Sequence, residues 1–280
     1  MRPGRFGTRV PPILISLVVA TLLALSAVLP AAAASYVVVT PTNTHGWSTA
    51  DTRPGGTVTF EADNAAPRGG GALQLTTDLT TAAKAQYLHA ANAGLADVTE
   101  LSYYTRQISA PFPEAAASYQ LVTCLNGTPA GACVGFSTFV FEPYQNPLQG
   151  VVVNNVWQPW DVDAGLLWST RTVTCSGGVI VGTPGGPATY TLAAVQALCP
   201  DAVAVGFGVN IGTFNPGYTV RTDLVDFNGT IYDFELTNVP TDKNQCKNGG
   251  YVDFTDADGQ PFKNQGQCIK AANNDQGGGG

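Results

Sequence analysis

The chain has 280 residues, of which 44% are hydrophobic and 12% are charged, and its formal net charge is −7. This length accommodates one large domain with a sizeable hydrophobic core. The acidic balance argues against a nucleic-acid partner and against an anionic membrane surface, because both need clustered Lys and Arg.

The first 34 residues have the organisation of a secretory signal peptide. Three arginines lie within the first nine positions, residues 13–29 are almost unbroken apolar sequence, and Pro30 precedes four alanines. A transmembrane anchor is the alternative, because the apolar run is close to the shortest that spans a bilayer. Pro30 and the one-sided charge favour cleavage near Ala34. We therefore expect a secreted, extracellular protein without a membrane span, whose mature chain carries ten basic and twenty acidic residues.

Residues 35–239 have the pattern of one β-rich domain. Short alternating or apolar runs are rich in Val, Thr, Tyr and Phe, and Gly, Pro, Asn and Asp separate them. No fixed-period repeat extends through the region, which argues against propellers and solenoids. The pattern predicts an all-β antiparallel jelly-roll sandwich. An immunoglobulin-like sandwich is the alternative, disfavoured by the length and by the absence of Cys-Trp-Cys spacing. The predicted strands are 36–39, 57–61, 72–76, 99–105, 118–123, 136–141, 150–153, 171–174, 203–211 and 230–236.

Two stretches have helical character. Residues 192–198, within T-L-A-A-V-Q-A-L-C-P, predict a short helix that ends before Pro200. Residues 82–90 are ambiguous, because their alanines favour a helix whereas their position suits a strand of the sandwich. We favour a strand for the second half of that stretch.

Both ends of the β-rich region carry a family resemblance. The sequence G-W-S-T-A-D-T-R-P-G-G-T-V-T-F-E begins at Gly46, and V-D-F-N-G-T-I-Y-D-F-E begins at Val225. Together they resemble the opening and closing strands of lectin-like and carbohydrate-binding-module-like jelly rolls. The resemblance implies that the first and last strands pair in one sheet. It is a likeness of fold, which does not by itself carry function.

The cysteines predict disulfides rather than a metal site. An even number in an exported chain indicates disulfide bonds, and six cysteines allow fifteen pairings. Structural zinc is the alternative, but the chain has no C-x-x-C and only two histidines. The order along the chain favours three local pairs: Cys124 with Cys133, Cys175 with Cys199, and Cys246 with Cys268.

The last cysteine pair brackets a short cassette. Its sequence is K-N-Q-C-K-N-G-G-Y-V-D-F-T-D-A-D-G-Q-P-F-K-N-Q-G-Q-C, in which Lys-Asn-Gln occurs twice. It resembles a small two-cysteine module that closes many otherwise unrelated secreted bacterial proteins. We expect a stapled hairpin over 240–270 that turns at D-A-D-G, with Gly259 at a positive φ. The Gly-rich residues 271–280 have the composition of a disordered tail.

An aromatic group is the feature that most indicates a ligand. Flat rings flanked by Asp, Asn and Gln suit sugars, which have a polar rim and an apolar C–H face. Core packing is the alternative, because tryptophan is mostly buried. Trp160, next to Pro159 and an aspartate, is the better candidate for exposure. The candidate ligand-binding residues are Tyr144, Trp157, Trp160 and Trp168.

The sequence contains no complete catalytic motif of the hydrolase classes considered. The only histidines are His45 and His89, and there is no G-x-S-x-G elbow to expose a serine nucleophile. A glycosidase requires two facing carboxylates, and the retaining-glucanase pattern of two glutamates around an aspartate on one strand is absent. Glu142, in F-V-F-E-P-Y, is the most promising single acid. We therefore assign no catalytic residue.

Structural calcium is what the jelly-roll resemblance implies as a cofactor. Such modules often hold Ca²⁺ between their first and last strands through carboxylates and backbone oxygens. The alternative is that these acids face solvent. The candidate metal ligands in the corresponding segments are Glu61, Asp63, Asp226 and Asp233.

The sequence thus favours a secreted, non-catalytic binding protein with carbohydrate as the leading ligand class. Its expected partner is an extracellular glycan or another cell-surface polymer. One alternative is an extracellular glycan-active hydrolase or lyase. A second alternative is a structural or adhesive cell-surface protein.

Overall fold

The chain folds as a β-sandwich of the jelly-roll type, as the sequence predicts. The computed structural model describes residues 35–275; the expected signal peptide, 1–34, and residues 276–280 lie outside the described residues. A seven-stranded and a five-stranded sheet form the two layers, and the core lies between them. The strands are β1 (Ser35–Val39), β2 (Gly56–Ala62), β3 (Gly71–Thr77), β4 (Ala85–Gly94), β5 (Leu101–Ser109), β6 (Ser118–Cys124), β7 (Phe136–Phe141), β8 (Trp157–Asp161), β9 (Leu167–Ser169), β10 (Val173–Thr174), β11 (Ile180–Val181), β12 (Val203–Ile211), β13 (Thr219–Phe227) and β14 (Thr230–Phe234).

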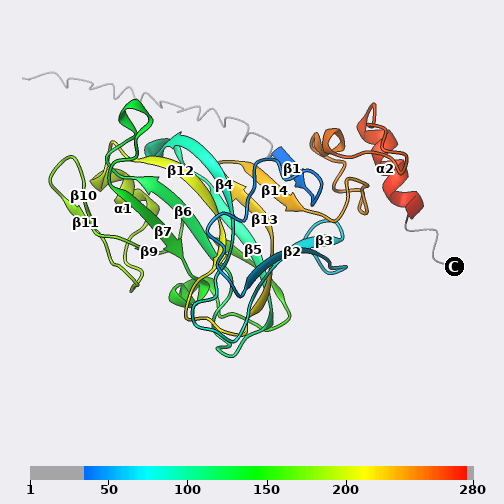
Figure 1. Cartoon of the computed structure of the whole chain (residues 1–280). Coiled ribbons are helices and arrows are strands. Elements are labelled where there is room, and N and C mark those ends of the chain that lie inside the picture. Colours follow the sequence, from blue (N-terminus) through cyan, green and yellow to red (C-terminus); the bar gives the residue numbers. More distant parts are fainter. Residues whose placement is uncertain (1–34, 276–280) are drawn as a thin grey trace, which may run out of the picture. The chain divides into compact units, whose positions relative to one another are not determined.

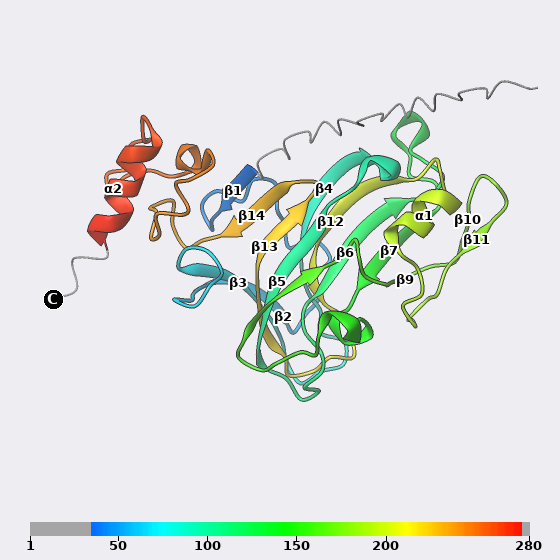
Figure 2. The same cartoon turned by 180° about the vertical axis from the view of Figure 1, so that it is seen from behind.

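The five-stranded sheet has the order β4-β12-β6-β7-β9, and every pairing in it is antiparallel. Figure 1 and Figure 2 show β4, β12, β6 and β7 side by side, with helix α1 (Leu192–Leu198) and the β10–β11 hairpin next to β9. Successive side chains of a strand point to opposite faces. In β6, Tyr119 and Leu121 therefore enter the core, while Ser118 and Gln120 lie on the outer face.

The seven-stranded sheet is built around β13. Strands β3 and β14 pair with successive parts of one edge of β13. Strand β5 pairs with the other edge of β13, and β8 pairs with β5. The first strand, β1, pairs with the last, β14, as the jelly-roll resemblance implies, and this pair is parallel. A register shift falls between Asp223 and Asp226, where Leu224 has a φ of 48°. Here the Asp223 side chain accepts the backbone N–H of Phe234 at 2.9 Å, which satisfies a donor at the end of β14.

Aromatic side chains fill much of the core. The Trp47 ring stacks on Tyr87 with centroids 5.3 Å apart, and it meets Phe207 and Phe234 edge-on. All four side chains are buried. Such pairs contribute roughly 0.5–1.5 kcal/mol each beyond their buried area. These contacts join strands of both sheets.

Most predicted elements are found. Strands β7 and β12 and helix α1 have the predicted bounds, and β4 covers the second half of the ambiguous stretch 82–90. Thr191 caps α1 by accepting the N–H of Ala194 at 3.1 Å. The strand prediction at 150–153 is wrong: that segment has no strand, and β8, β9 and β13 are present where none was expected. The remaining short helices are 3₁₀ helices: η1 (Leu95–Asp97), η2 (Pro129–Gly131), η3 (Pro143–Gln145), η4 (Pro147–Gln149) and η5 (Gly250–Asp253).

All three local disulfides are formed. They join Cys124 to Cys133, Cys175 to Cys199, and Cys246 to Cys268. In the chain-entropy model, loops of this size contribute roughly 3 kcal/mol each.

The C-terminal cassette differs from the expected hairpin. Gly259 has the predicted positive φ, +77°, but a single bridge between Thr255 and Pro261 replaces the flanking strands. Instead, η5 precedes the turn and helix α2 (Gln265–Asp275) follows it. The disorder predicted for 271–280 is therefore wrong for 271–275, and the rest lies outside the described residues. Packing around the disulfide and the aromatic side chains, which strand propensity does not capture, determines the fold of this small unit.

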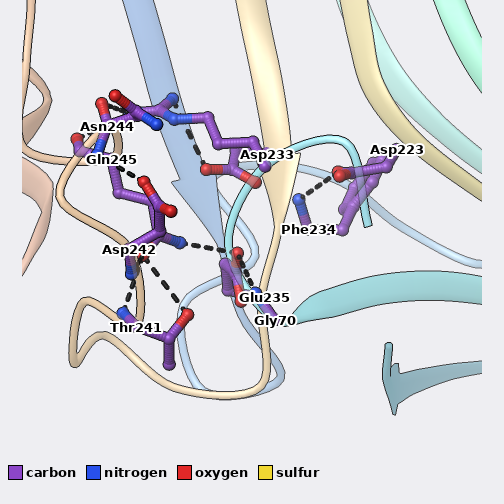
Figure 3. A network of polar contacts seen from close by, with 10 residues as sticks. Gly70, Asp223, Asp233, Phe234, Glu235, Thr241, Asp242, Asn244 and Gln245 are labelled. Carbon is purple, nitrogen blue, oxygen red and sulfur yellow. Dashed lines mark hydrogen bonds and ion pairs between the residues drawn. The ribbon is translucent and has the colours of Figure 1, made fainter. Parts of the chain in front are cut away.

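The cassette is attached to the sandwich through β1 and β14. Val38 of β1 packs with Cys246, Phe254 and Cys268 in a second, smaller core. Polar contacts join the same two parts, as Figure 3 shows: Gln245 Nε2 donates to Glu235 Oε1 at 2.6 Å. We call the set Arg68, Asp233, Glu235, Asn244 and Gln245 the junction network.

Arg68 is the cation of the junction network. Its Nη2 donates to the carbonyl of Gln245 at 2.6 Å, and its Nη1 lies 3.4 Å from Asp233 Oδ2. The guanidinium also lies 3.7 Å above the ring of Tyr36. Gly69, at φ +71°, leaves space for Glu235, because a Cβ there would lie 1.5 Å from Glu235 Oε1. One arginine thus joins β1, β14 and the cassette.

Candidate functional site

A cleft of about 710 Å³ lies on the outer face of the five-stranded sheet. Its floor follows the cross-strand neighbours Gln120, Val140 and Trp168, which are paired across β6, β7 and β9. Four strand spacings of about 4.8 Å separate β4 from β9, so the sheet face is about 19 Å wide. This width suits an extended ligand that crosses several strands.

Amide and hydroxyl groups form the polar part of the floor. Gln120 Nε2 donates to Ser118 Oγ at 2.8 Å, and Asn210 Nδ2 donates to Gln86 Oε1 at 2.8 Å. All four side chains are buried. Side chains held in this way keep a fixed orientation, which preorganises donors and acceptors for a ligand.

An indole ring held by a carboxylate marks the β9 end of the cleft. Trp168 is partly buried, and its Nε1 donates to Glu142 Oε2 at 2.8 Å. The same oxygen accepts Gln145 Nε2 at 2.5 Å. Glu142 is the only carboxylate among the described residues that line the cleft.

Exposed aromatic rings form part of the rim of the cleft. Tyr144 is 44% exposed, and its ring meets that of Phe112 edge-on at 6.4 Å. Tyr218, directly before β13, donates its hydroxyl hydrogen to the carbonyl of Phe112 at 3.2 Å. Burial, with the Glu142 charge and hydrogen bond next, raises the pKa of Tyr144, so its phenol stays neutral and can donate and accept hydrogen bonds. Phe214, which is 80% exposed, also lines the cleft, and its backbone N–H donates to the carbonyl of Thr81 at 2.8 Å.

Basic side chains mark the β4 end of the cleft. Arg53 and Lys84 are paired by a backbone bridge and both line the cleft. Lys84 Nζ forms an ion pair with Asp51. The cleft therefore has an aromatic end and a basic end.

Of the four predicted ligand-binding aromatics, the cleft brings together Tyr144 and Trp168. Trp157 and Trp160 lie instead on β8 of the other sheet. The expectation that Trp160 is exposed is wrong: it is 1% exposed, and its Nε1 donates to Thr105 Oγ1 at 2.7 Å. Antiparallel pairing of β8 with β5 turns Trp160 inward, and a neighbouring proline does not reveal that register.

Several residues of the cleft were not singled out in the sequence. They are Arg53, Lys84, Phe112, Gln120 and Asn210. For Gln120 the sequence contains a signal, because polar and apolar residues alternate along 118–121. The others come from loops or strand ends whose neighbours are fixed only by the fold.

The four predicted calcium ligands do not come together in one site. Asp63 is held by Arg106 at 2.7 Å and by Arg221 at 2.9 Å. Burial opposes its ionisation, but hydrogen bonds from Arg221, the backbone of Ala65 and Arg106 keep the pKa of Asp63 below its usual value. Two guanidinium groups at this carboxylate leave no place for a cation.

The other three acids have separate partners. Glu61 accepts Thr59 Oγ1 at 2.9 Å, Asp226 accepts the N–H of Gly229 at 2.9 Å, and Asp233 belongs to the junction network. Burial raises the pKa of Asp226 to about 6. Within residues 35–275, no three His, Cys, Asp or Glu side chains are grouped to hold a metal ion. The predicted set does not fit a shared calcium ion, and calcium binding by this chain stays a prediction.

The histidines lie away from the cleft. His89 is packed among the rings of Trp47, Phe207 and Tyr232, and His45 is exposed. Neither lines the cleft, so neither faces Glu142 as a catalytic partner there. Among residues 35–275, no helix has the length and apolar character needed to cross a membrane.

Comparison with known proteins gives fold likenesses only. No protein-family model matches the chain, and no curated protein matches it. Among solved structures, it is similar to a family 11 carbohydrate-binding module from Clostridium thermocellum in complex with a β-1,3-1,4-mixed-linked tetrasaccharide, with 10% identity, a TM-score of 0.38, and coverage of 67% of this chain and 91% of that one. It is also similar to the family 11 module of a cellulosomal cellulase from C. thermocellum, with 12% identity, a TM-score of 0.36, and coverage of 68% and 89%.

Proposed function

We propose that the protein is an exported, non-catalytic binding protein whose cleft on the five-stranded sheet holds a carbohydrate chain. The observation that carries the proposal is the pairing of ring faces with a fixed polar floor. Tyr144 and Trp168 offer apolar surface to sugar C–H faces, and Gln120 and Asn210 offer amides to sugar hydroxyls. Extracellular location is part of the proposal, and three disulfides support it.

Binding is favoured over hydrolysis because of the carboxylates. Both glycosidase geometries need two carboxyl groups facing the scissile bond. Glu142 alone among the described residues of the cleft carries one, and its Oε2 accepts hydrogen bonds from Trp168 and Gln145. Release of reducing sugar from a polysaccharide panel would instead support the hydrolase alternative.

The proposal is tested by glycan-array and affinity-gel binding of the wild type, Trp168→Ala and Trp157→Ala. Both tryptophans are partly buried, but Trp157 lies on the other sheet and does not line the cleft. We expect Trp168→Ala to lower affinity about tenfold to a hundredfold, since burying a large apolar side chain contributes roughly 1.5–3 kcal/mol. Trp157→Ala should bind as the wild type does. Equal losses in both variants, or no glycan retained by the wild type, would contradict the proposal.

A further inference from the structure

Arg53 differs from every other arginine between residues 35 and 275. Arg68, Arg106 and Arg221 each form an ion pair with an aspartate, and Arg171 lies over the ring of Phe136. In the described part of the chain, the Arg53 guanidinium has no ion pair, hydrogen bond or ring partner. It is exposed, and it lines the cleft.

The position of Arg53 is fixed by the fold. Its backbone N–H donates to the carbonyl of Lys84 at 2.9 Å, immediately before β4 begins. This bridge places two basic side chains next to each other at one end of the cleft. Lys84 is itself paired with Asp51, whose side chain is 60% exposed.

The charge at this end contrasts with the rest of the molecule. The chain has a net charge of −7, and the one acid that lines the cleft, Glu142, follows β7 near the opposite end. A guanidinium presents a planar set of donors that matches two oxygens of a carboxylate or a sulfate. The nearest acid in the sequence, Asp51, is paired with Lys84 and does not line the cleft, so the lining itself has no carboxylate near Arg53.

We propose that the β4 end of the cleft binds an anionic oxygen group, a carboxylate or a sulfate, carried by a sugar of the bound glycan. Arg53 provides the bidentate contact with its unpaired guanidinium, and Lys84, whose charge is shared with Asp51, lies beside it. The aromatic end binds the neighbouring sugars by stacking. This inference rests on the proposed glycan-binding function and assigns the cleft a preference for acidic over neutral polysaccharides.

The test compares matched pairs of acidic and neutral glycans. Polygalacturonate is paired with its carboxyl-reduced form, and dextran sulfate is paired with dextran. Affinities are measured for the wild type, Arg53→Ala and Arg53→Lys at low and high salt. Arg171→Ala is the control, because it removes an exposed arginine that does not line the cleft.

The wild type should bind at least one acidic glycan about tenfold more tightly than its neutral partner, the change that about 1.4 kcal/mol produces. Arg53→Ala should remove this preference and leave affinity for the neutral form unchanged. Arg53→Lys should keep part of it, because lysine retains the charge but not the planar fork. The pair that shows the preference tells whether the group is a carboxylate or a sulfate.

Each other outcome has a definite meaning. Binding of neutral glycans without any preference for the acidic partners overturns this inference and leaves the proposed function standing. An equal loss in Arg53→Ala and Arg171→Ala also overturns it, because it would reflect only the net charge. If the wild type binds none of the four glycans, this inference is overturned. If it also binds nothing on the full glycan array, the proposed function is overturned as well.

Discussion

At the scale of single residues, Glu142 shows how a neighbour changes the meaning of a side chain. Its sequence context, an acid within an aromatic strand, made it the best candidate for acid catalysis. In the structure it follows β7 and accepts the indole N–H of Trp168 at 2.8 Å. It is therefore a positioning residue that fixes the ring at the aromatic end of the cleft.

Glu142→Ala should lower glycan affinity about threefold to tenfold, because loss of one hydrogen bond to Trp168 contributes about 1 kcal/mol. Glu142→Gln should keep most of the affinity, since its amide oxygen still accepts the indole N–H. Titration calorimetry and tryptophan fluorescence on glycan addition measure the effect. An equal loss of glycan affinity in Glu142→Gln and Glu142→Ala would contradict the positioning role. Release of reducing sugar by the wild type that is lost in Glu142→Gln would show that Glu142 is catalytic.

At the scale of elements, β14 brings buried acids to the junction network. Burial, followed by the charge of Asp233, raises the pKa of Glu235 to about 9. Burial also raises the pKa of Asp233 to about 7, although Arg68 opposes that shift. Burial and the charge of Asp233 raise the pKa of Asp223 in β13. The negative charge of Asp253 in η5 contributes to the raised pKa of Asp233. These carboxyl groups stay protonated on folding at a pH where the unfolded chain has released the protons.

We expect stability to fall as the pH rises across the range of these pKa values. The folded state binds more protons, so the contribution is fully present below about pH 4 and is lost as the pH rises through about 7 to about 9. Urea unfolding at a series of pH values measures it. Glu235→Gln, which stays neutral, should flatten the dependence, whereas the exposed control Glu114→Gln should not. A wild-type stability that is constant or rises over this range would contradict the expectation.

At the scale of the whole described chain, the cassette is bound to the sandwich rather than loosely appended. Its disulfide packs on Val38 of β1, and its backbone carbonyls at Asn244 and Gln245 accept hydrogen bonds from Arg68. The domain boundary near Pro240 stays a prediction. The sandwich nevertheless has its own core and its own two disulfides, Cys124–Cys133 and Cys175–Cys199.

The double variant Cys246→Ser/Cys268→Ser should loosen the cassette and leave the sandwich folded. The lost bond contributes roughly 3 kcal/mol, which is large for so small a core. Limited proteolysis followed by mass spectrometry should find early cuts after Pro240. The control Cys175→Ser/Cys199→Ser removes a bond of similar span, 24 residues against 22, from the sandwich itself. Equal attack on both regions in the cassette variant would show that the two unfold together.

The sequence by itself determined the elements and bonds that depend on near neighbours. Alternation placed β7 and β12, alanines before a proline placed α1, and the order of the cysteines gave all three pairs. The cleft depended on the tertiary structure, because a site is made by residues far apart in the chain. Strand register brought Trp168 beside Val140 and turned Trp160 into the core, and a bridge set Arg53 beside Lys84. Local sequence fixes how a strand alternates, but only packing against the second sheet decides which of its two faces meets solvent.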